Sequence, residues 1–282
     1  MKLSSIILKL KNEIFRSKVD SRYGIGYLEQ KIFNNWFNPF LSFWINFRSL
    51  PLKQAMKFPI WVFGRPRLYC LSGRIIINDE VKSGMIKFNI VNSGAPGNMT
   101  GQSELLNLGI IEFNGSCKFG TGNKIIVSYG KKLQFGKNCR IMNNCTIAVH
   151  ERICIGQDTI IAHSCQILDT NFHFTADLEK KRIGKRTKPV IIGEYCWICN
   201  SSSIMPGSVI PNYAIIGSQS MVNKDFSNYS QGCIIAGTPA KLIREGIVRV
   251  FNPSIENKIW AFWKNNNLDY FPLNDFTLKD LL

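Results

Sequence analysis

Aliphatic residues recur at every sixth position along the second half of the chain. The clearest run contains Ile192, Ile198, Ile204, Ile210, Ile216 and Val222. A small side chain stands four residues after each of the first five aliphatics, namely Cys196, Ser202, Ser208, Ala214 and Ser220. An α-helix, with its period of about 3.6 residues, and a simple strand, with its period of about 2, do not produce both rules together.

The same six-residue step returns upstream in three triplets, of which the last is the weakest. They are Ile155, Ile161 and Ile167; Phe135, Ile141 and Ile147; and Phe113, Phe119 and Ile125. Three such hexads make one triangular coil, whose flat sides are short parallel strands and whose aliphatics point inward. The small residue lies at the corner, where a larger side chain would collide with the next coil. The pattern therefore predicts a mainly β protein built as a left-handed parallel β-helix.

One interruption of the repeat is much longer than the others. Nineteen extra residues separate Ile167 from Ile192. Connections of this length in a regular solenoid are usually functional, because binding and catalytic groups concentrate on loops held by a rigid scaffold. We therefore predict an extended functional loop over residues 172–190.

Composition narrows the class of protein. The chain has 282 residues with 45% hydrophobic content, which is enough for a large core, and a formal charge of +16. Its nine cysteines are odd in number and scattered, as expected for reduced thiols in a cytosolic protein. We see neither an apolar run long enough to span a bilayer nor a secretory signal, so a cytoplasmic location is predicted.

Three segments resemble the hexapeptide-repeat O-acetyltransferases, which include the galactoside and maltose acetyltransferases and enzymes of capsule and lipopolysaccharide synthesis. They are ILDTNFH, KPVIIGEYCWICNSSSIMPGSVIPNYAIIGSQSMVNKD and IIAGTPAKLIR, and the resemblance covers residues 110–246. It implies transfer of an acetyl group from acetyl-CoA to a hydroxyl of a sugar or glycan precursor in surface polysaccharide biosynthesis. It also implies a homotrimer with active sites between subunits and no metal.

The resemblance assigns His173 as the general base. Imidazole suits this role because its pKa lies near neutrality and a sugar hydroxyl must lose its proton as it attacks a thioester. Asp169 matches a residue that orients the base or contacts the acceptor, with an Asx-type turn as the alternative. His150 and Glu151 match residues that contact the acceptor; the alternative is that they lie at a solvated corner without a role. Asn143 is a further candidate for contact with the acceptor; the alternative is that it is an ordinary corner residue of the β-helix.

The resemblance also implies a set of CoA contacts. Trp197 matches the residue beside the pantetheine arm, and Asn200 matches a hydrogen-bonding residue near the thioester that could steady the oxyanion. The remaining implied contacts, which include basic residues near the nucleotide phosphates, are Ser218, Asn223, Lys224, Lys241 and Arg244.

Cys196 and Cys199 form a C-x-x-C pair, which in isolation suggests a redox pair or half of a zinc site. The six-residue repeat instead places Cys196 at a small corner position, so a structural role is favoured. An acyl-cysteine intermediate on Cys199 is the alternative chemistry.

The ends of the chain fall outside the repeat. We predict a basic, aromatic-rich helical extension over residues 1–68, the β-helix acyltransferase domain over 69–244, and a tail with a short helix over 245–282. The extension carries +9 of the charge and dense aromatics in 32–47. Two interpretations stay open: an interfacial helix pair that contacts an anionic membrane, and a cap over the first coil.

Two further functions stay open beside O-acetylation. One is N-acylation of an amino sugar. The other is a non-catalytic β-helix that serves as an assembly or binding module. The basic charge alone would permit nucleic-acid binding, but no recognisable nucleic-acid motif accompanies it, so a nucleic-acid partner is not expected. A lipid-linked glycan at the inner face of the membrane fits the charge better.

Overall fold

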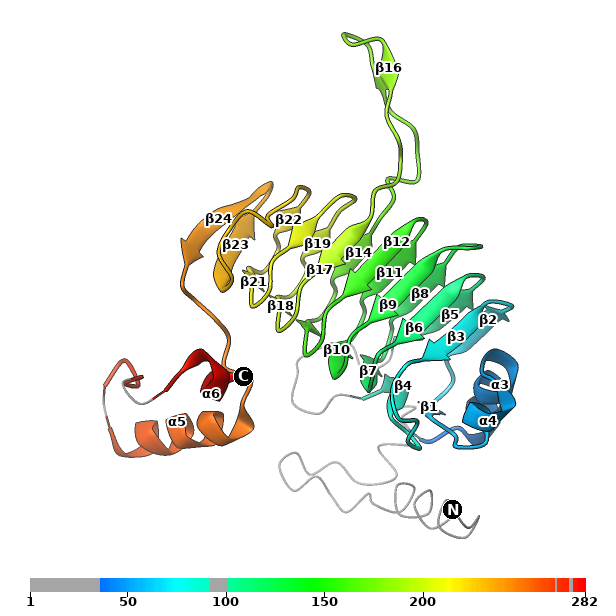
Figure 1. Ribbon diagram of the computed structural model, residues 1–282, viewed down its shortest axis with the longest axis horizontal. Coiled ribbons are helices and arrows are strands. Elements are labelled where there is room, and N and C mark those ends of the chain that lie inside the picture. The colour runs from blue at the N-terminus through cyan, green and yellow to red at the C-terminus, as the bar shows by residue number, and fades with distance from the viewer. Residues whose placement is uncertain (1–35, 92–100, 267, 274–275) are drawn as a thin grey trace.

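Three sheets form the sides of a triangular prism, and the chain visits them in turn (Figure 1). Their strands are parallel except for the final pair, β23 (Cys233–Gly237) and β24 (Ala240–Glu245), which is antiparallel. This computed structural model describes residues 36–91, 101–266, 268–273 and 276–282. The predictions that concern residues 1–35 therefore lie outside the described residues.

The sheets have nine, seven and six strands. The nine-stranded sheet contains β1 (Ile60–Val62), β4 (Ile86–Ile90), β7 (Cys117–Gly120), β10 (Cys139–Ile141), β13 (Ile160–Ile161), β18 (Trp197–Ile198), β21 (Ile215–Ile216), β23 (Cys233–Gly237) and β24 (Ala240–Glu245). The seven-stranded sheet contains β2 (Arg67–Leu71), β5 (Glu104–Asn107), β8 (Lys124–Val127), β11 (Thr146–Val149), β14 (Gln166–Leu168), β19 (Ser203–Ile204) and β22 (Met221–Val222). The six-stranded sheet contains β3 (Arg74–Ile77), β6 (Ile110–Phe113), β9 (Lys132–Phe135), β12 (Arg152–Ile155), β17 (Val190–Ile192) and β20 (Val209–Ile210).

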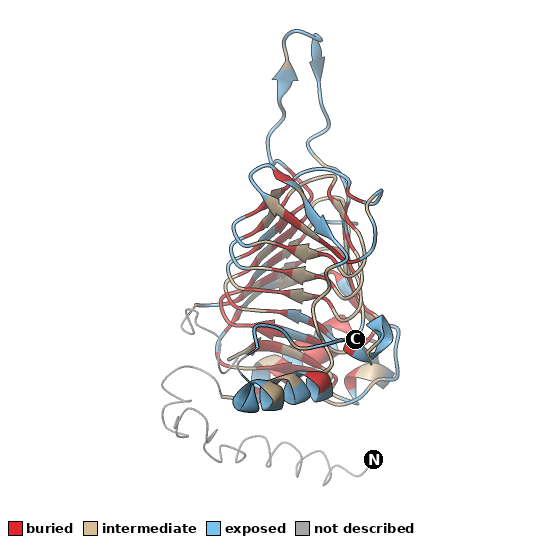
Figure 2. Ribbon diagram, turned by 90° about the vertical axis from the view of Figure 1, so that its left-hand side faces the viewer, coloured by how far each residue is buried: buried red, intermediate tan, exposed pale blue. Residues whose placement is uncertain are grey.

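The strand register confirms the six-residue repeat. Ile141 pairs with Ile161, Ile161 with Ile198, and Ile198 with Ile216, so the same inward position is kept from coil to coil. Even the weakest triplet is in register, because Phe113 pairs with Phe135. These side chains are buried and belong to one continuous apolar core. In Figure 2 buried positions, drawn in red, recur on each stacked coil. The predicted mainly β, parallel β-helix fold is confirmed.

Small polar side chains at the corners also form hydrogen bonds between coils. Cys145 Sγ donates to the carbonyl of Ala162 at 3.0 Å, and Ser202 Oγ donates to the carbonyl of Gly217 at 2.9 Å. Both donors are buried. Each bond joins one coil to the next. It gives a hydrogen-bond donor to a backbone carbonyl at the corner, where the chain leaves one sheet and the carbonyl has no partner in a strand.

The prism begins earlier than the regular repeat reveals. Strand β1 pairs with β4, and β2 pairs with β5, so coils are already stacked from Ile60 onward. The six-residue repeat does not reveal this region, because its strands are separated by longer and unequal connections. The register between β4 and β7 is also shifted by a bulge. A fixed six-residue period is therefore lost there, although the inward side chains remain apolar.

Helix α3 (Pro39–Ser49) lies along the free edge of β1 and completes its hydrogen bonding. Ser42 Oγ accepts from the Val62 N–H at 2.8 Å. Asn46 Oδ1 accepts from the Ile60 N–H at 3.1 Å, and Asn46 Nδ2 donates to the Ile60 carbonyl at 2.7 Å. An uncovered strand edge would expose these groups to pairing with another chain. The polar side chains of α3 therefore end the sheet.

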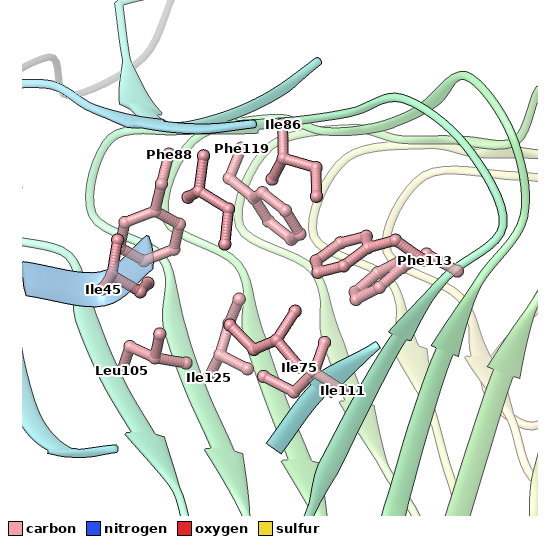
Figure 3. A pocket seen from close by; sticks show the side chains of 11 residues that line it. Ile45, Ile75, Ile86, Phe88, Leu105, Ile111, Phe113, Phe119 and Ile125 are labelled. Carbon is pink, nitrogen blue, oxygen red and sulfur yellow. The ribbon is translucent and has the colours of Figure 1, made fainter. Parts of the chain in front are cut away.

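The same helix closes the end of the apolar column. Ile45 projects from α3 toward the inward side chains of the first coils, among which a cavity of about 20 Å³ remains (Figure 3). The lining is entirely apolar, and it includes Phe88, Phe113 and Phe119. A cavity this small without polar partners is expected to stay dry.

Two features project from the prism. The loop between β14 and β17 extends as a hairpin of β15 (Ala176–Asp177) and β16 (Arg182–Ile183) (Figure 1). After β24 the chain forms α5 (Pro253–Asn265) and α6 (Leu278–Leu281), which confirms the predicted short C-terminal helix. A further short helix, α4 (Leu52–Ala55), follows α3. Across the part of the chain that the structure describes, every helix is too short or too polar to cross a bilayer.

We expect Asn46→Ala to lower the free energy of unfolding by about 2–3 kcal/mol, because it leaves the buried N–H and carbonyl of Ile60 without partners. Urea unfolding followed by circular dichroism measures this loss. Asn265→Ala on α5 is the control, since that exposed side chain makes one bond of 3.4 Å to the Ala261 carbonyl. Its effect should stay within about 0.5 kcal/mol. Equal, small losses in both variants would contradict the edge-covering role of α3.

Candidate active site

The predicted site residues lie at two different corners of the prism. We call the passage from the nine- to the seven-stranded sheet the first corner, and the passage from the seven- to the six-stranded sheet the second corner. Asp169 follows β14 and therefore lies at the second corner, as do His150 and Glu151, which follow β11. Asn143 and Asn200 follow β10 and β18 and therefore lie at the first corner.

Asp169 joins two coils at the second corner. Its Oδ1 accepts from the His150 N–H at 2.7 Å, and its Oδ2 accepts from the Glu151 N–H at 2.8 Å. The side chain is buried. Burial raises the pKa of the Asp169 carboxyl, and the backbone N–H groups partly offset this by stabilising the carboxylate. Both oxygens are thus engaged by backbone, and Asp169 fixes the position of His150 and Glu151 directly.

The imidazole of His150 is half-buried against the base of the extended loop. Its Nδ1 lies 3.2 Å from Ser128 Oγ, one coil earlier. Its ring meets the ring of Phe172 edge-on, with 5.5 Å between centroids. His150 therefore borders the segment that carries His173.

His173 is exposed where the extended loop leaves the prism. Its N–H donates to the Asn171 carbonyl at 2.7 Å. The two arms of the loop are tied together there, because the Asn171 N–H donates to the Arg186 carbonyl at 2.8 Å and Arg186 Nη1 donates to the Phe172 carbonyl at 3.2 Å. These bonds hold the backbone of His173 at the base of the hairpin. Within the described residues no hydrogen bond joins Asp169 to His173.

A ladder of polar side chains runs up the first corner. The Asn143 N–H donates to His163 Nδ1 at 3.4 Å, and the His163 N–H donates to Asn200 Oδ1 at 3.3 Å. Burial lowers the pKa of His163 and so favours its neutral form, and the contact with the Asn143 N–H is consistent with an unprotonated Nδ1. Asn143 Oδ1 also accepts from the Thr121 N–H at 3.2 Å, and the residue is buried. The structure therefore places Asn143 inside a coil corner, apart from His150 and Glu151.

Trp197 is half-buried on the outer face of the nine-stranded sheet, where the chain after β24 returns across it. The guanidinium of Arg249 lies 5.1 Å from the centre of the Trp197 ring and 4.9 Å from that of Phe251. Burial lowers the pKa of Arg249. Sequence reasoning did not find Arg249, because it follows the last repeat and no periodic pattern marks it.

The other predicted CoA contacts are exposed near the C-terminal coils. Ser218 lies at the first corner, two residues after β21. Asn223 and Lys224 follow β22, and Lys224 Nζ lies 4.9 Å from the centre of the Phe226 ring. Lys241 and Arg244 lie on β24, the last strand of the nine-stranded sheet.

One chain therefore carries the candidate base and the candidate oxyanion group on opposite edges of the seven-stranded sheet. His173 leaves from the second corner, and Asn200 lies at the first. Among the residues with described positions, no group of three or more His, Cys, Asp and Glu side chains is arranged to hold a metal ion. The available chemistry is that of an exposed imidazole, amide groups and cations.

Comparison with known proteins gives O-acetyltransferases and, among the solved structures, also an N-acyltransferase of Bacillus cereus, although no protein-family model matches the chain. WbbJ of Escherichia coli K12, provisionally named a lipopolysaccharide biosynthesis O-acetyl transferase, is 27% identical over 55% of this chain and 78% of its own length. The galactoside O-acetyltransferase of the same organism is 30% identical over 43% of this chain and 58% of its own. Among solved structures, the polySia-specific acetyltransferase NeuO is 21% identical over 73% of this chain and 88% of its own, with a TM-score of 0.43.

The chain is similar in sequence to O-acetyltransferases. This confirms the resemblance found in its motifs, and it identifies the protein as an acetyltransferase. The β-helix is thus the scaffold of an enzyme of this kind.

Cys199 lies beside Trp197, and burial raises the pKa of its thiol to about 11. Such a thiol is scarcely ionised near neutral pH, so it is a poor nucleophile. We expect Cys199→Ser to keep the acetyl-transfer rate within about threefold of wild type, because no acyl group needs to pass through the sulfur. Steady-state CoA release measures the rate. A large loss of rate, with an acyl group on Cys199 in peptide mass spectra of the wild type, would contradict this expectation.

Proposed function

We propose that this acetyltransferase moves an acetyl group from acetyl-CoA to a hydroxyl of a sugar or glycan precursor in surface polysaccharide biosynthesis. The observation that carries the proposal is the relationship to O-acetyltransferases, together with the placement of His173 at the base of a loop inserted into the β-helix. The names of WbbJ and of the galactoside enzyme support a saccharide acceptor. The sequence predicts an acyltransferase unit over residues 69–244, and we extend its N-terminal boundary to Ile60, because β1 and β2 already stack on the coils that follow.

In the proposed reaction His173 acts as general base. Its imidazole takes the proton of the acceptor hydroxyl while that oxygen attacks the thioester carbonyl of acetyl-CoA. The tetrahedral intermediate then collapses, the C–S bond breaks, and the CoA thiolate leaves with the proton returned by the imidazolium. The exposure of His173 supports this role, because an acceptor can reach it. His150 and Glu151, fixed by Asp169, flank the base of the loop as candidate acceptor contacts.

CoA is proposed to lie along the first corner and the adjoining face of the nine-stranded sheet. Trp197 and Arg249 would flank its pantetheine arm, and Asn200 would donate to the oxyanion. Ser218, Asn223, Lys224, Lys241 and Arg244 are exposed toward the C-terminal coils, where cations suit the nucleotide phosphates. No step in this chemistry requires a metal.

The separation of His173 from Asn200 supports an active site shared between copies of the chain. In a cyclic homotrimer, the second corner of one subunit meets the first corner of the next at three equivalent interfaces. Each site would then combine His173 from one subunit with Asn200 and Trp197 from its neighbour. We propose this homotrimer as the catalytic unit.

We place the enzyme in the cytoplasm, where acetyl-CoA is available and its nine free cysteines would remain reduced. A lipid-linked glycan acceptor would bring it to the inner face of the membrane. The excess of cations in the N-terminal part of the sequence supports this contact.

We expect His173→Ala to lower kcat by about a hundredfold or more, with little change in KM for acetyl-CoA, because only proton transfer is lost. Labelled acetyl-CoA and extracted nucleotide-linked and lipid-linked glycans, followed by mass spectrometry, identify and quantify the product. Lys181→Ala at the tip of the same hairpin is the control. A near-normal rate in His173→Ala would contradict the assignment of the base. A product that survives mild alkali would be an amide and would favour N-acylation.

We expect two inactive variants to restore activity when they assemble together. In mixed trimers of His173→Ala and Asn200→Ala chains, about one third of the interfaces join an intact base to an intact amide, because each such ring has a single interface of that kind. Co-expression with two affinity tags isolates the mixed species, and CoA release measures their activity. Trimers in which every chain carries His173→Ala are the control. Mixed trimers as inactive as this control would show that each site lies within one subunit.

A further inference from the structure

Helix α3 presents aromatic rings to solvent, and the face that it turns toward the protein is polar apart from Ile45 and the partly buried Leu41. Ser42 and Asn46 are buried because they complete the edge of β1. The opposite face carries aromatic rings at helical spacing: Phe40 (83% exposed), Phe43 (56%), Trp44 (55%) and Phe47 (38%). A helix on the surface of a soluble protein normally buries its apolar stripe and exposes its polar one. In α3 the aromatic residues are on the exposed side instead, and polar residues share the buried side with Ile45.

Helix α4 continues the exposed apolar surface. Leu52 and Met56 are 67% and 66% exposed. Both helices lie together at the N-terminal end of the prism (Figure 1). We call these six side chains, four aromatic and two aliphatic, the α3–α4 face. Contiguous exposed apolar groups of this kind mark an interaction surface.

The charged residues on and directly after the two helices of the α3–α4 face are all of one sign. Arg48, Lys53 and Lys57 belong to the same two helices or follow them directly, and the sequence has no Asp or Glu from residue 36 to residue 77. None of the ion pairs between described residues uses these three cations. Two copies meeting face to face through this surface would bring like charges together, which disfavours self-association. Aromatic rings bordered by unpaired cations instead match an interface of acyl chains and anionic headgroups.

We propose that the α3–α4 face docks the protein on an anionic lipid bilayer. Phe43 and Trp44 enter the headgroup region, and Arg48, Lys53 and Lys57 contact lipid phosphates. The helix cannot roll over to hide its rings, because its polar face is held by β1. The β15–β16 hairpin projects sideways from the prism and stays free (Figure 1). If the proposed function holds, His173 therefore remains accessible to a lipid-linked acceptor, but the docking itself does not depend on catalysis.

Co-sedimentation of the full-length protein with vesicles tests the proposal. Vesicles of phosphatidylcholine with phosphatidylglycerol are compared with vesicles of phosphatidylcholine alone. We expect the protein to bind the anionic vesicles, and we expect this binding to weaken as salt is added. The affinity should fall at least about tenfold in the double variant Phe43→Ser, Trp44→Ser. It should fall about fivefold for each of Arg48→Gln and Lys53→Gln. Trp260→Ser on α5, which removes a ring that is 68% exposed, is the matched control and should bind as wild type.

Several results would overturn the proposal. Absence of binding by the wild type is one. Wild-type binding by the Phe43→Ser, Trp44→Ser variant is another, and it would assign the contact to residues 1–35, which are unchanged in every variant. A third is a wild type that assembles into a larger species which the double variant disperses in gel filtration. Circular dichroism checks that the variants are folded, and acetyl transfer to a water-soluble acceptor, measured in parallel, separates a failure of docking from a failure of the proposed function.

Discussion

The stacking of inward side chains in strict register is the constraint on which the whole molecule depends. No single coil can bury its aliphatic side chains, so each coil is stable only between neighbours of the same size. Equal size requires each side of the triangle to contribute six residues and each corner to hold a side chain small enough for the next coil to approach. The buried Cys, Ser, Thr and Ala residues at the corners satisfy this requirement, and several also donate a hydrogen bond to the next coil. An insertion is therefore tolerated at a corner, because there it leaves the stacked inward side chains in register.

This constraint explains where the chemistry lies. The extended loop is inserted at the second corner, between β14 and β17, and the strands on either side keep their register with the coils below. Asp169 makes the insertion compatible with the prism, because its buried carboxylate binds backbone N–H groups of the preceding coil. The loop can therefore project while its base is fixed. A rigid base and an exposed imidazole are what a general base requires when its acceptor is large.

The ends of the prism follow from the same requirement. A stack of coils leaves an apolar mouth and an unpaired strand edge at its first coil, and α3 covers both. Ile45 covers the mouth, while Ser42 and Asn46 occupy the edge. Because Ser42 and Asn46 face the protein, the aromatic side chains on the opposite side of α3 face solvent. The cap and the aromatic surface, which the sequence presented as two alternative interpretations, are thus two faces of one helix.

The sequence by itself determined the fold, because a six-residue period with a small residue at plus four fits only one way of stacking strands. It also located the loop that carries His173, since a long insertion into a regular repeat is visible by counting. It did not determine which candidates share a corner. Asn143 and His150 are seven residues apart, yet one coil side separates them, and only the strand register assigns them to different edges of the seven-stranded sheet. Nor did it identify Arg249, or the face that α3 turns outward. Those features depend on contacts between segments distant in the sequence, such as Asn46 with Ile60 and Arg249 with Trp197, and such contacts leave no local periodicity to read.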